Sequence, residues 1–555
     1  MKRIVQAVAV ATVLAAGPGV AWAVTAGSDQ RANEPQVQGS PGSNNSAVFP
    51  TNKQNEPTIA LNPVHLNFLI AGSNDEQRQP PCGPGPLRGT TPASDCSFFP
   101  GVGTSGVYTS GDGGATWINR GLLDDQAAWQ RAGVVSDGDP VIAYGPKPDS
   151  AGRFSWDNGQ RAYYSTLASI AGAKGTEYIA VSTSDDNGIS WTAPVVATTK
   201  TSAADFNDKN WIAVDTTATS AQFGRVYLSW TEFRSATQKG FGNEPVMVSS
   251  SSDGGASFGA PKQLSPAANN GTGNGRQGSS VTTGPDGTVY VAFEQGSSQV
   301  VAISGDGAKS FTRPITVGPV TDIADPIPGA NFRTDSFPTI AADPQPGSTT
   351  VHVAWSTRTP SGGRMQVASS TDRGLTWGAP AQVSAGEGYA FFQGLDVTAS
   401  GRVVLAYQVL NANNPVVFGT GNARIDVYAT SKPVGGPWST PAKLNTAPSD
   451  PAVSAQNNLQ RQFWGDYNTL VATDSAAWFI STDGRTGAGC PDVDAYQKYL
   501  KDNGLVVRGD MADRLSQRST GMNPALSDPS VKPAPPVSCP PQFGNTDVFV
   551  TTFVP

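Results

Sequence analysis

The sequence predicts an all-β fold, a β-propeller of four-stranded blades, with seven blades favoured and six as the alternative. The first observation is a turn motif that occurs five times, at intervals of about one small sheet. The second is the series of strand-like segments around each copy, in a chain of 555 residues that holds 62 Gly and 44 Pro. The copies are Thr109 to Trp117, Ser184 to Trp191, Ser251 to Phe258, Ser304 to Phe311 and Ser370 to Trp377.

The turn motif reads Ser, any residue, Asp, any residue, Gly, any residue, Ser or Thr, and an aromatic, with Ala308 replacing Gly in the fourth copy. Its Asp can accept hydrogen bonds from nearby backbone amides, and its Gly relieves a strained backbone position. The aromatic can pack beneath the turn. The motif therefore predicts a structural turn, and we do not expect catalysis from its aspartates, which are Asp112, Asp186, Asp253, Asp306 and Asp372.

The N-terminus predicts export. A basic start at residues 1–3, an apolar run from Ile4 to Ala16 and the small residues Ala21 and Ala23 are typical of a secretory signal peptide over residues 1–23. The run is too short to span a bilayer, and no later stretch is apolar enough to do so. Residues 24–47 are rich in Gln, Ser, Asn and Gly and are expected to be disordered. Residues 48–555 then form one propeller domain of a secreted, extracellular protein, expected to be a monomer.

Seven units of strands can be assigned along the chain. The first five cover residues 58–122, 140–197, 210–264, 279–317 and 338–383, each with four strands and the turn motif between the third and fourth. The sixth, 394–444, has a degenerate turn around Trp438. The seventh, 467–553, has only three strands, and we expect the N-terminal segment near Val48 to Thr51 to supply the fourth and close the ring.

The four cysteines of an exported chain predict two disulfides, Cys82 with Cys96 and Cys490 with Cys539. Each pair lies in one of the two longest insertions, residues 77–103 and 486–545. Both insertions join a second strand to a third, in the first and seventh units, which become neighbours when the ring closes. We therefore expect them to form a binding rim on the face opposite the turn motifs, with a short helix at Asp492 to Leu500.

Charge and histidine content exclude several functions. The net charge is -7 without a basic cluster, which argues against nucleic acid as a partner. His65 and His352 are the only histidines, so a Ser-His-Asp triad and a His-rich zinc site are not expected. His352 lies in an alternating strand and is expected to be structural. No metal or organic cofactor is predicted, although the sequence leaves a structural Ca²⁺ in an acidic loop open.

The loops between blades and the ends of the second strands carry the remaining candidates for chemistry, and their charges should converge on the mouth of the central channel. The alternative is that these charges pair with one another and cap the channel structurally. The interblade loops contribute Glu56, Asp139, Asp208, Lys209, Arg276, Arg333, Asp335, Tyr389, Arg461, Trp464, Asp466 and Tyr467. The second-strand ends contribute Asp75, Glu232, Arg234, Glu294, Arg358, Asp483 and Arg485.

A smaller set is singled out for its chemistry. Carboxyl groups, or a carboxyl beside a phenol, can cleave glycosides, and this selects Asp466, Tyr467 and Glu232 as candidate catalytic residues. Guanidinium groups bind carboxylates in a bidentate manner, and this selects Arg333, Arg461 and Arg485 for an acidic substrate. Asp335 and Trp464 complete the predicted substrate site, although Trp464 can equally be core packing.

Several segments resemble the sialidase-like (neuraminidase) superfamily, in particular secreted bacterial propellers with Asp-box, or BNR, repeats. The resemblance rests on the turn motifs and on the phrases NEPTIALNP, NDKNWIAVD, FRTDSFPTIAADP and FWGDYNTLVATD. It implies an arginine triad, a Tyr nucleophile assisted by Glu, and an Asp acid/base. The Arg-Ile-Pro motif that normally carries the first arginine is absent, since Thr and Asp follow Phe332-Arg333.

Two functions from different classes follow. The first is a sialidase-like glycoside hydrolase that acts on extracellular glycans, with acidic sugars as its expected substrates. The alternative is a non-catalytic propeller that binds glycan or protein, and a lyase for acidic sugars is a third interpretation. A carbohydrate or glycoconjugate is the expected partner in the first case.

Overall fold

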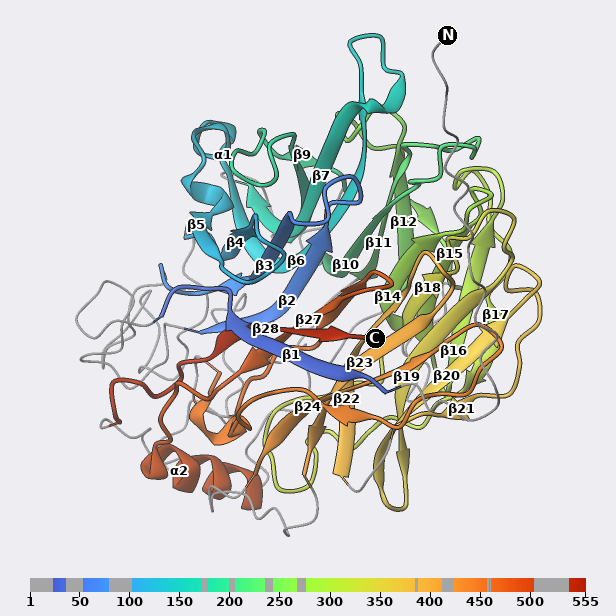
Figure 1. Cartoon of the computed structure of the whole chain (residues 1–555). Coiled ribbons are helices and arrows are strands. Elements are labelled where there is room, and N and C mark those ends of the chain that lie inside the picture. Colours follow the sequence, from blue (N-terminus) through green and yellow to red (C-terminus); the bar gives the residue numbers. More distant parts are fainter. Residues whose placement is uncertain are drawn as a thin grey trace, which may run out of the picture.

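The computed structural model describes residues 23–35, 53–78, 102–170, 177–198, 205–234, 243–266, 276–384, 388–411, 423–456, 459, 461–503 and 539–555. Over these ranges the protein is an all-β propeller of antiparallel sheets arranged around an axis (Figure 1). This confirms the predicted fold class. Every helix in the described ranges is too short or too polar to cross a membrane.

Four of the sheets follow the chain without interruption, each with its strands in sequence order. The first sheet contains β2 (Gln54–Leu61), β3 (Leu69–Asp75), β4 (Ser105–Ser110) and β5 (Ile118–Leu122), and the second contains β6 (Val134–Pro148), β7 (Phe154–Ile170), β8 (Tyr178–Ser184) and β9 (Val195–Val196). The third contains β10 (Phe206–Val214), β11 (Val226–Phe233), β12 (Val246–Ser251) and β13 (Lys262–Gln263). The fourth contains β14 (Arg276–Thr283), β15 (Val289–Gln295), β16 (Ser298–Ser304) and β17 (Ile315–Pro319). A 3-10 turn at Leu123–Asp125 and helix α1 (Ala127–Ala132) follow β5.

The next eight strands form one sheet that consists of two antiparallel groups of four. The groups are β18 (Thr339–Ala342), β19 (Val351–Thr359), β20 (Gly362–Ser370) and β21 (Ala381–Gln382), then β22 (Gly388–Val397), β23 (Val403–Leu410), β24 (Ile425–Lys432) and β25 (Ala442–Lys443). They are joined by a short parallel pairing of β20 with β22, at Gly362 and Gly388. A side chain on Gly362 would lie 2.1 Å from the Gly388 carbonyl oxygen, so glycine is what allows the two backbones to meet.

The last sheet joins the two ends of the chain. It contains β26 (Thr469–Ala472), β27 (Ala477–Asp483), β28 (Asp547–Val554) and, as its outer strand, β1 (Thr25–Arg31). Figure 1 shows β1 in blue beside β28 in red. The first strands β2, β6, β10, β14, β18, β22 and β26 contact one another in this order, and β26 contacts β2. The first strands therefore form a closed ring.

The closing strand corrects the prediction for residues 24–47. The N-terminal segment does close the ring, but with Thr25–Arg31, which were expected to be disordered; the predicted segment, Val48 to Thr51, lies outside the described residues. An outer strand faces solvent on much of its surface, and polar composition is what such a strand needs. Low hydrophobicity is therefore not evidence for disorder here.

An ion-pair latch holds β1 in place. Arg485 donates from Nη1 to Asp29 Oδ2 of β1 at 2.6 Å and from Nη2 to Asp483 Oδ2 of β27 at 2.6 Å. The Asp29 side chain is only 1% exposed, and Thr551 of β28 donates to its other oxygen. Arg485 thus fastens the first strand of the chain to the last sheet.

The turn motifs have the geometry predicted for them. In all five, the Ser hydroxyl donates to the Asp at 2.7–2.8 Å, and the residue at the Gly position donates its N–H to that Ser at 2.8–3.0 Å. The closing Ser or Thr donates its N–H to the Asp. Ala308 adopts φ 65°, the left-handed conformation that Gly takes in the other copies. The closing aromatics pack against the cores between sheets.

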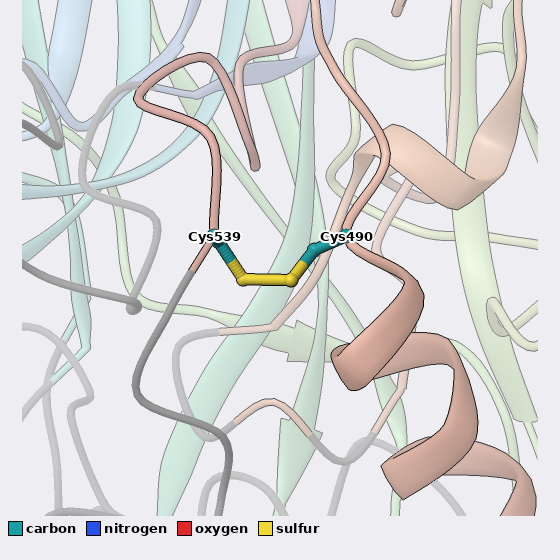
Figure 2. The surroundings of a disulfide bond; sticks show 2 residues. All are labelled: Cys490 and Cys539. Atoms are coloured by element: carbon teal, nitrogen blue, oxygen red, sulfur yellow. A yellow bond between two sulfur atoms is a disulfide. The ribbon is translucent and has the colours of Figure 1, made fainter.

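The second predicted disulfide is confirmed. Cys490 and Cys539 are bonded, and helix α2 (Pro491–Asp502) begins immediately after Cys490 (Figure 2). This helix covers the predicted Asp492 to Leu500. Cys82 and Cys96 lie outside the described residues. The structural interpretation of His352 is confirmed as well, because its ring Nδ1 is 2.7 Å from Ser369 Oγ and burial lowers its pKa to about 4.

The latch predicts that Arg485→Ala destabilises the protein. The substitution leaves the buried Asp29 carboxylate without its guanidinium partner, a situation that costs about 3–5 kcal/mol. We expect a lower unfolding temperature and faster tryptic cleavage after Arg31. Arg424→Ala removes a more exposed ion pair with Asp450 and serves as the control, with an expected effect below about 1 kcal/mol. Equal effects of the two substitutions would contradict the role of the latch.

Candidate functional site

Five of the first strands carry the same irregularity where they enter the ring, and in three consecutive sheets it falls on a charged residue. The register of β2, β6 and β10 shifts by inserted residues, and the first inserted residue has a left-handed backbone: Glu56 (φ 52°), Asp139 (φ 52°) and Lys209 (φ 54°). The same shift occurs in β14 at Gly278 (φ 65°) and in β22 at Phe392 (φ 47°), so the bulge is a general feature of the first strands. The bulges bring the three side chains together.

Asp466 is the centre of this arrangement. Arg333 binds it in a bidentate manner, with Nε–Oδ1 at 2.7 Å and Nη2–Oδ2 at 2.6 Å, and Lys209 Nζ lies 2.6 Å from Oδ2. Glu56 lies 3.6 Å from Arg333 and 3.8 Å from Lys209, while Asp139 accepts the Lys209 backbone N–H at 3.1 Å. We call these five residues the axial charge cluster. All of them are buried.

The cluster contains three carboxyl groups and two cations, and its protonation follows from this imbalance. Burial raises the pKa of Glu56 well above its ordinary value, more than the attraction of Lys209 lowers it. Burial would also raise the pKa of Asp466, but Arg333 and Lys209 hold it well below its ordinary value. Burial thus disfavours the charged form of Glu56, whereas the two cations stabilise the charged form of Asp466.

This geometry makes Asp466 a structural centre. It precedes β26, Lys209 lies in β10, and Arg333 precedes β18, so one carboxylate connects three sheets at the ring axis. Because Asp466 is held in its ionised form, it has no proton to donate. The sequence left open the alternative that these charges pair with one another and cap the channel. The structure agrees with this alternative for the axial charge cluster.

Tyr467 is fixed by a backbone carbonyl and by neighbouring side chains. Its hydroxyl donates to the Pro140 carbonyl oxygen at 3.0 Å, and its ring packs edge-on to Trp211 with Lys209 Nζ 4.9 Å from the ring centre. Burial, reinforced by Asp139 and Glu56, raises its pKa well above the ordinary value. The phenol is therefore neutral, and its hydroxyl is directed to a backbone carbonyl.

A pocket lies beside the axial charge cluster. Its volume is about 470 Å³, counted with the part that is open to solvent. Four aromatic side chains line it together with carboxyl, amide and hydroxyl groups, and all come from the ring of first strands or the segments leading into it. The lining residues are Lys209, Asn210, Trp211, Gly278, Ser279, Asp335, Phe337, Pro338, Thr339, Phe392, Gln393, Asp466 and Tyr467. We call it the channel-mouth pocket.

The structure does not bring the predicted arginine group together. Arg333 lies in the axial charge cluster, whereas Arg461 is buried and donates to Asp325 Oδ1 at 2.8 Å, and Arg485 holds the N-terminal strand. Each of the three already has a carboxylate partner. These three arginines therefore do not form a common binding site for a substrate carboxylate.

Two further predicted residues lie away from the pocket lining. Glu232, at the end of β11, pairs with Arg234 at 2.9 Å. Trp464 is fully buried in the core that contains Phe332 and Phe391, and its Nε1 donates to Gln408 at 3.1 Å. The core interpretation of Trp464 is thus confirmed, and the residue cannot stack on a sugar.

Asp335 lines the pocket and also belongs to a second group of carboxyls. Carboxylate oxygens of Glu294, Asp322 and Asp335 all lie within 4.8 Å of one another. We call this group the carboxyl trio. Burial raises the pKa of Glu294 well above its ordinary value, and its two acidic neighbours raise it further. Arg358 lies close enough to act on Asp322, but three ionised carboxyls would carry more negative charge than this one cation balances.

Comparison with known proteins gives the family. The BNR repeat-like domain matches residues 178–467, which is more than half of the chain. The chain belongs to the BNR repeat-like domain family. No curated protein matches it.

Solved structures of carbohydrate-active enzymes are similar to this BNR repeat-like propeller at low identity. An α-L-arabinanase of Penicillium chrysogenum, complexed with arabinobiose, is 14% identical, over 65% of this chain and 91% of its own, with a TM-score of 0.41. The NanB sialidase of Streptococcus pneumoniae is 10% identical, over 75% and 80%, with a TM-score of 0.38. An α-L-arabinofuranosidase of Fusarium graminearum is 11% identical, over 83% and 93%, with a TM-score of 0.40. At these identities the similarity concerns the fold, and the activities of those enzymes are not assigned to this protein.

Sequence reasoning located part of this site. Glu56, Asp139 and Lys209 are in the predicted interblade set, but no motif singles them out, because their importance comes from bulges that meet in space. Trp211 and Phe337, which line the pocket, belong to phrases that carry the family resemblance. Asp322 was missed entirely, and no sequence signal marks it.

The protonation of the axial charge cluster predicts opposite outcomes for two conservative substitutions. Asp466→Asn leaves two buried cations without their carboxylate and should destabilise the protein by about 3–5 kcal/mol. Glu56→Gln resembles the protonated acid and keeps an acceptor for Asn74, which donates to Glu56 Oε2 at 2.9 Å, so it should change stability by less than about 1 kcal/mol. Thermal and denaturant unfolding measure both. A large loss with Glu56→Gln would show that Glu56 is ionised.

Proposed function

We propose that this protein binds carbohydrate in the channel-mouth pocket. The observation that carries the proposal is the composition of the pocket, in which Trp211, Phe337, Phe392 and Tyr467 lie among amide, hydroxyl and carboxyl groups. Sugars present apolar C–H faces and polar edges, and a site of this kind matches both. The solved structures similar in fold include an arabinanase complexed with a sugar, which is compatible with the proposal.

The rigidity of the aromatic side chains supports the proposal. Trp211 is half-buried and packs against the cores on both sides of its own sheet. Tyr467 is fixed by Trp211, Lys209 and the Pro140 carbonyl. Phe337 lies 5.5 Å from Lys209 Nζ. Rings held in this way lose little conformational entropy when a ligand stacks on them.

We further infer an exported protein with seven blades. The predicted signal peptide and the Cys490–Cys539 disulfide both favour an oxidising, extracellular environment. The seven first strands that contact one another in a closed ring favour seven blades, with the eight-stranded sheet counted as two. Predicted cleavage after Ala23 leaves the buried Val24 and strand β1 intact.

Glycoside hydrolysis is the second candidate function. One observation favours it: two carboxyl groups, Asp335 and Asp466, line the same pocket. Asp466 is held ionised, and Asp335 lies beside two other carboxyl groups, where one group of the set tends to keep a proton. Glycosidases use a protonated and an ionised carboxyl, so this function requires the proton of the group to lie on Asp335, whereas burial raises the pKa of Glu294. The positions of Tyr467, Arg461 and Arg485 weigh against the sialidase version of this chemistry.

The binding proposal predicts that Trp211→Ala weakens glycan binding about tenfold or more, because about 1.4 kcal/mol of stacking is lost. Glycan arrays identify a ligand, and calorimetry on the purified protein measures its affinity. Trp438→Ala is the matched control, since Trp438 is also half-buried but belongs to the degenerate turn of the sixth unit. Unfolding temperatures of both variants separate lost binding from lost folding. Unchanged affinity in Trp211→Ala would remove the proposed site.

The hydrolysis candidate predicts release of a fluorescent aglycone from at least one member of a panel of glycosides that includes sialosides. Asp335→Asn should then lower kcat by about a hundredfold or more, as expected for loss of a general acid. Tyr467→Phe should retain activity within about tenfold, since its hydroxyl is directed to a backbone carbonyl. Loss of all activity with Tyr467→Phe would instead indicate a sialidase-type nucleophile, and no turnover on the panel would leave binding alone.

A further inference from the structure

The carboxyl trio brings together two segments that are separate in the sequence. Glu294 lies near the end of β15, whereas Asp322 and Asp335 lie in the long segment between β17 and β18. Their carboxylate oxygens are within 4.8 Å of one another. At such separations ionised carboxylates repel strongly, so a proton or a cation is required among them.

A second observation at the same place points to a cation. Gln299 is fully buried beside Glu294; its amide N–H group donates to the Ser336 carbonyl oxygen at 2.8 Å, and its Oε1 has no hydrogen-bond partner in the described part of the chain. Oε2 of Glu294 is buried and has no hydrogen-bond partner there, although the Glu294 carboxyl group interacts with Asp322 and Gln299. A shared proton would satisfy a pair of carboxyl oxygens, but it would leave the Gln299 oxygen without a donor. The Gln299 and Glu294 oxygens lack hydrogen-bond donors, and such oxygens can serve as ligands of a metal ion.

We propose that Glu294, Asp322 and Asp335 bind one divalent cation, and that this cation is Ca²⁺. The donors are oxygens, which hard cations prefer, and there is no His or Cys among them. Ca²⁺ accepts irregular sets of carboxylate and amide oxygens and completes its coordination with water, whereas Mg²⁺ demands a nearly octahedral set. Three carboxylates provide more than enough charge to balance one divalent ion.

The position of the site gives the ion a structural role next to the pocket. Asp335 contributes to both the carboxyl trio and the pocket lining, and its Oδ1 accepts the Ser336 backbone N–H at 2.8 Å. Phe337, two residues further, is a pocket aromatic. A cation that joins Asp335 to β15 therefore fixes one side of the pocket. The cation site itself does not depend on what the pocket binds.

Calorimetric titration of the metal-free, full-length secreted protein with CaCl₂ tests the proposal, in the absence of any glycan. We expect one Ca²⁺ per chain and a higher unfolding temperature in millimolar CaCl₂ that is reversed by chelator. The double variant Glu294→Gln/Asp322→Asn should bind Ca²⁺ at least about tenfold more weakly, because two ligand charges are lost. MgCl₂ should raise the unfolding temperature less than CaCl₂.

The control is Asp185→Asn/Asp286→Asn, which removes two carboxylates that form ion pairs elsewhere, with Arg161 and Arg373. It should bind Ca²⁺ as the wild type does. Absence of stoichiometric binding to the wild-type protein, or equal affinity in the two double variants, would overturn the proposal. The proposal would be supported if Glu294→Gln/Asp322→Asn unfolded at a higher temperature than the metal-free wild type and if CaCl₂ left that temperature unchanged. The substitutions would then have removed the repulsion between carboxylates that Ca²⁺ otherwise neutralises.

Discussion

A single buried carboxylate, Asp466, holds together the part of the ring on which any function depends. A propeller brings the first strands of all its sheets to one axis, and their side chains must fill or cap the channel there. In this protein the cap is ionic: Arg333 and Lys209 bind Asp466 at 2.6–2.7 Å, and each of the three comes from a different sheet or its leading segment. The bulge at Lys209, with its left-handed backbone, is the local structure that brings Lys209 to Asp466.

This ionic cap determines which residues remain available for chemistry. Arg333 and Lys209 hold Asp466 ionised, burial disfavours the charged form of Glu56, and Tyr467 is neutral and directed to a carbonyl. These three side chains are therefore committed to structure. What remains accessible is the adjoining pocket, with its aromatic rings and the carboxyl of Asp335. The chemistry of the molecule has to be sought on that side of the cluster.

The sequence predicted the fold well because the propeller signal is local and repeated. Each turn motif determines its own hydrogen bonds, and the disulfide of Cys490 follows from compartment and spacing. The site was predicted less well because its geometry is not local. Arg461 and Arg485 were grouped with Arg333 by residue type, but the structure pairs them with Asp325 and Asp29, from distant parts of the chain. Polar β1 was expected to be disordered for the same reason: its partner, β28, is at the other end of the chain.

Asp335 connects the two proposals and makes them interdependent. A cation in the carboxyl trio requires Asp335 to be ionised, whereas general acid catalysis requires it to carry a proton, so one molecule cannot do both at once. With Ca²⁺ bound, Asp335 is a fixed acceptor for sugar hydroxyls and the pocket suits binding. Without it, one carboxyl of the trio must hold a proton, and hydrolysis requires that this carboxyl be Asp335 rather than Glu294, which burial favours. The cation site thus bears on the hydrolysis candidate, because an Asp335 that binds the cation cannot act as its general acid.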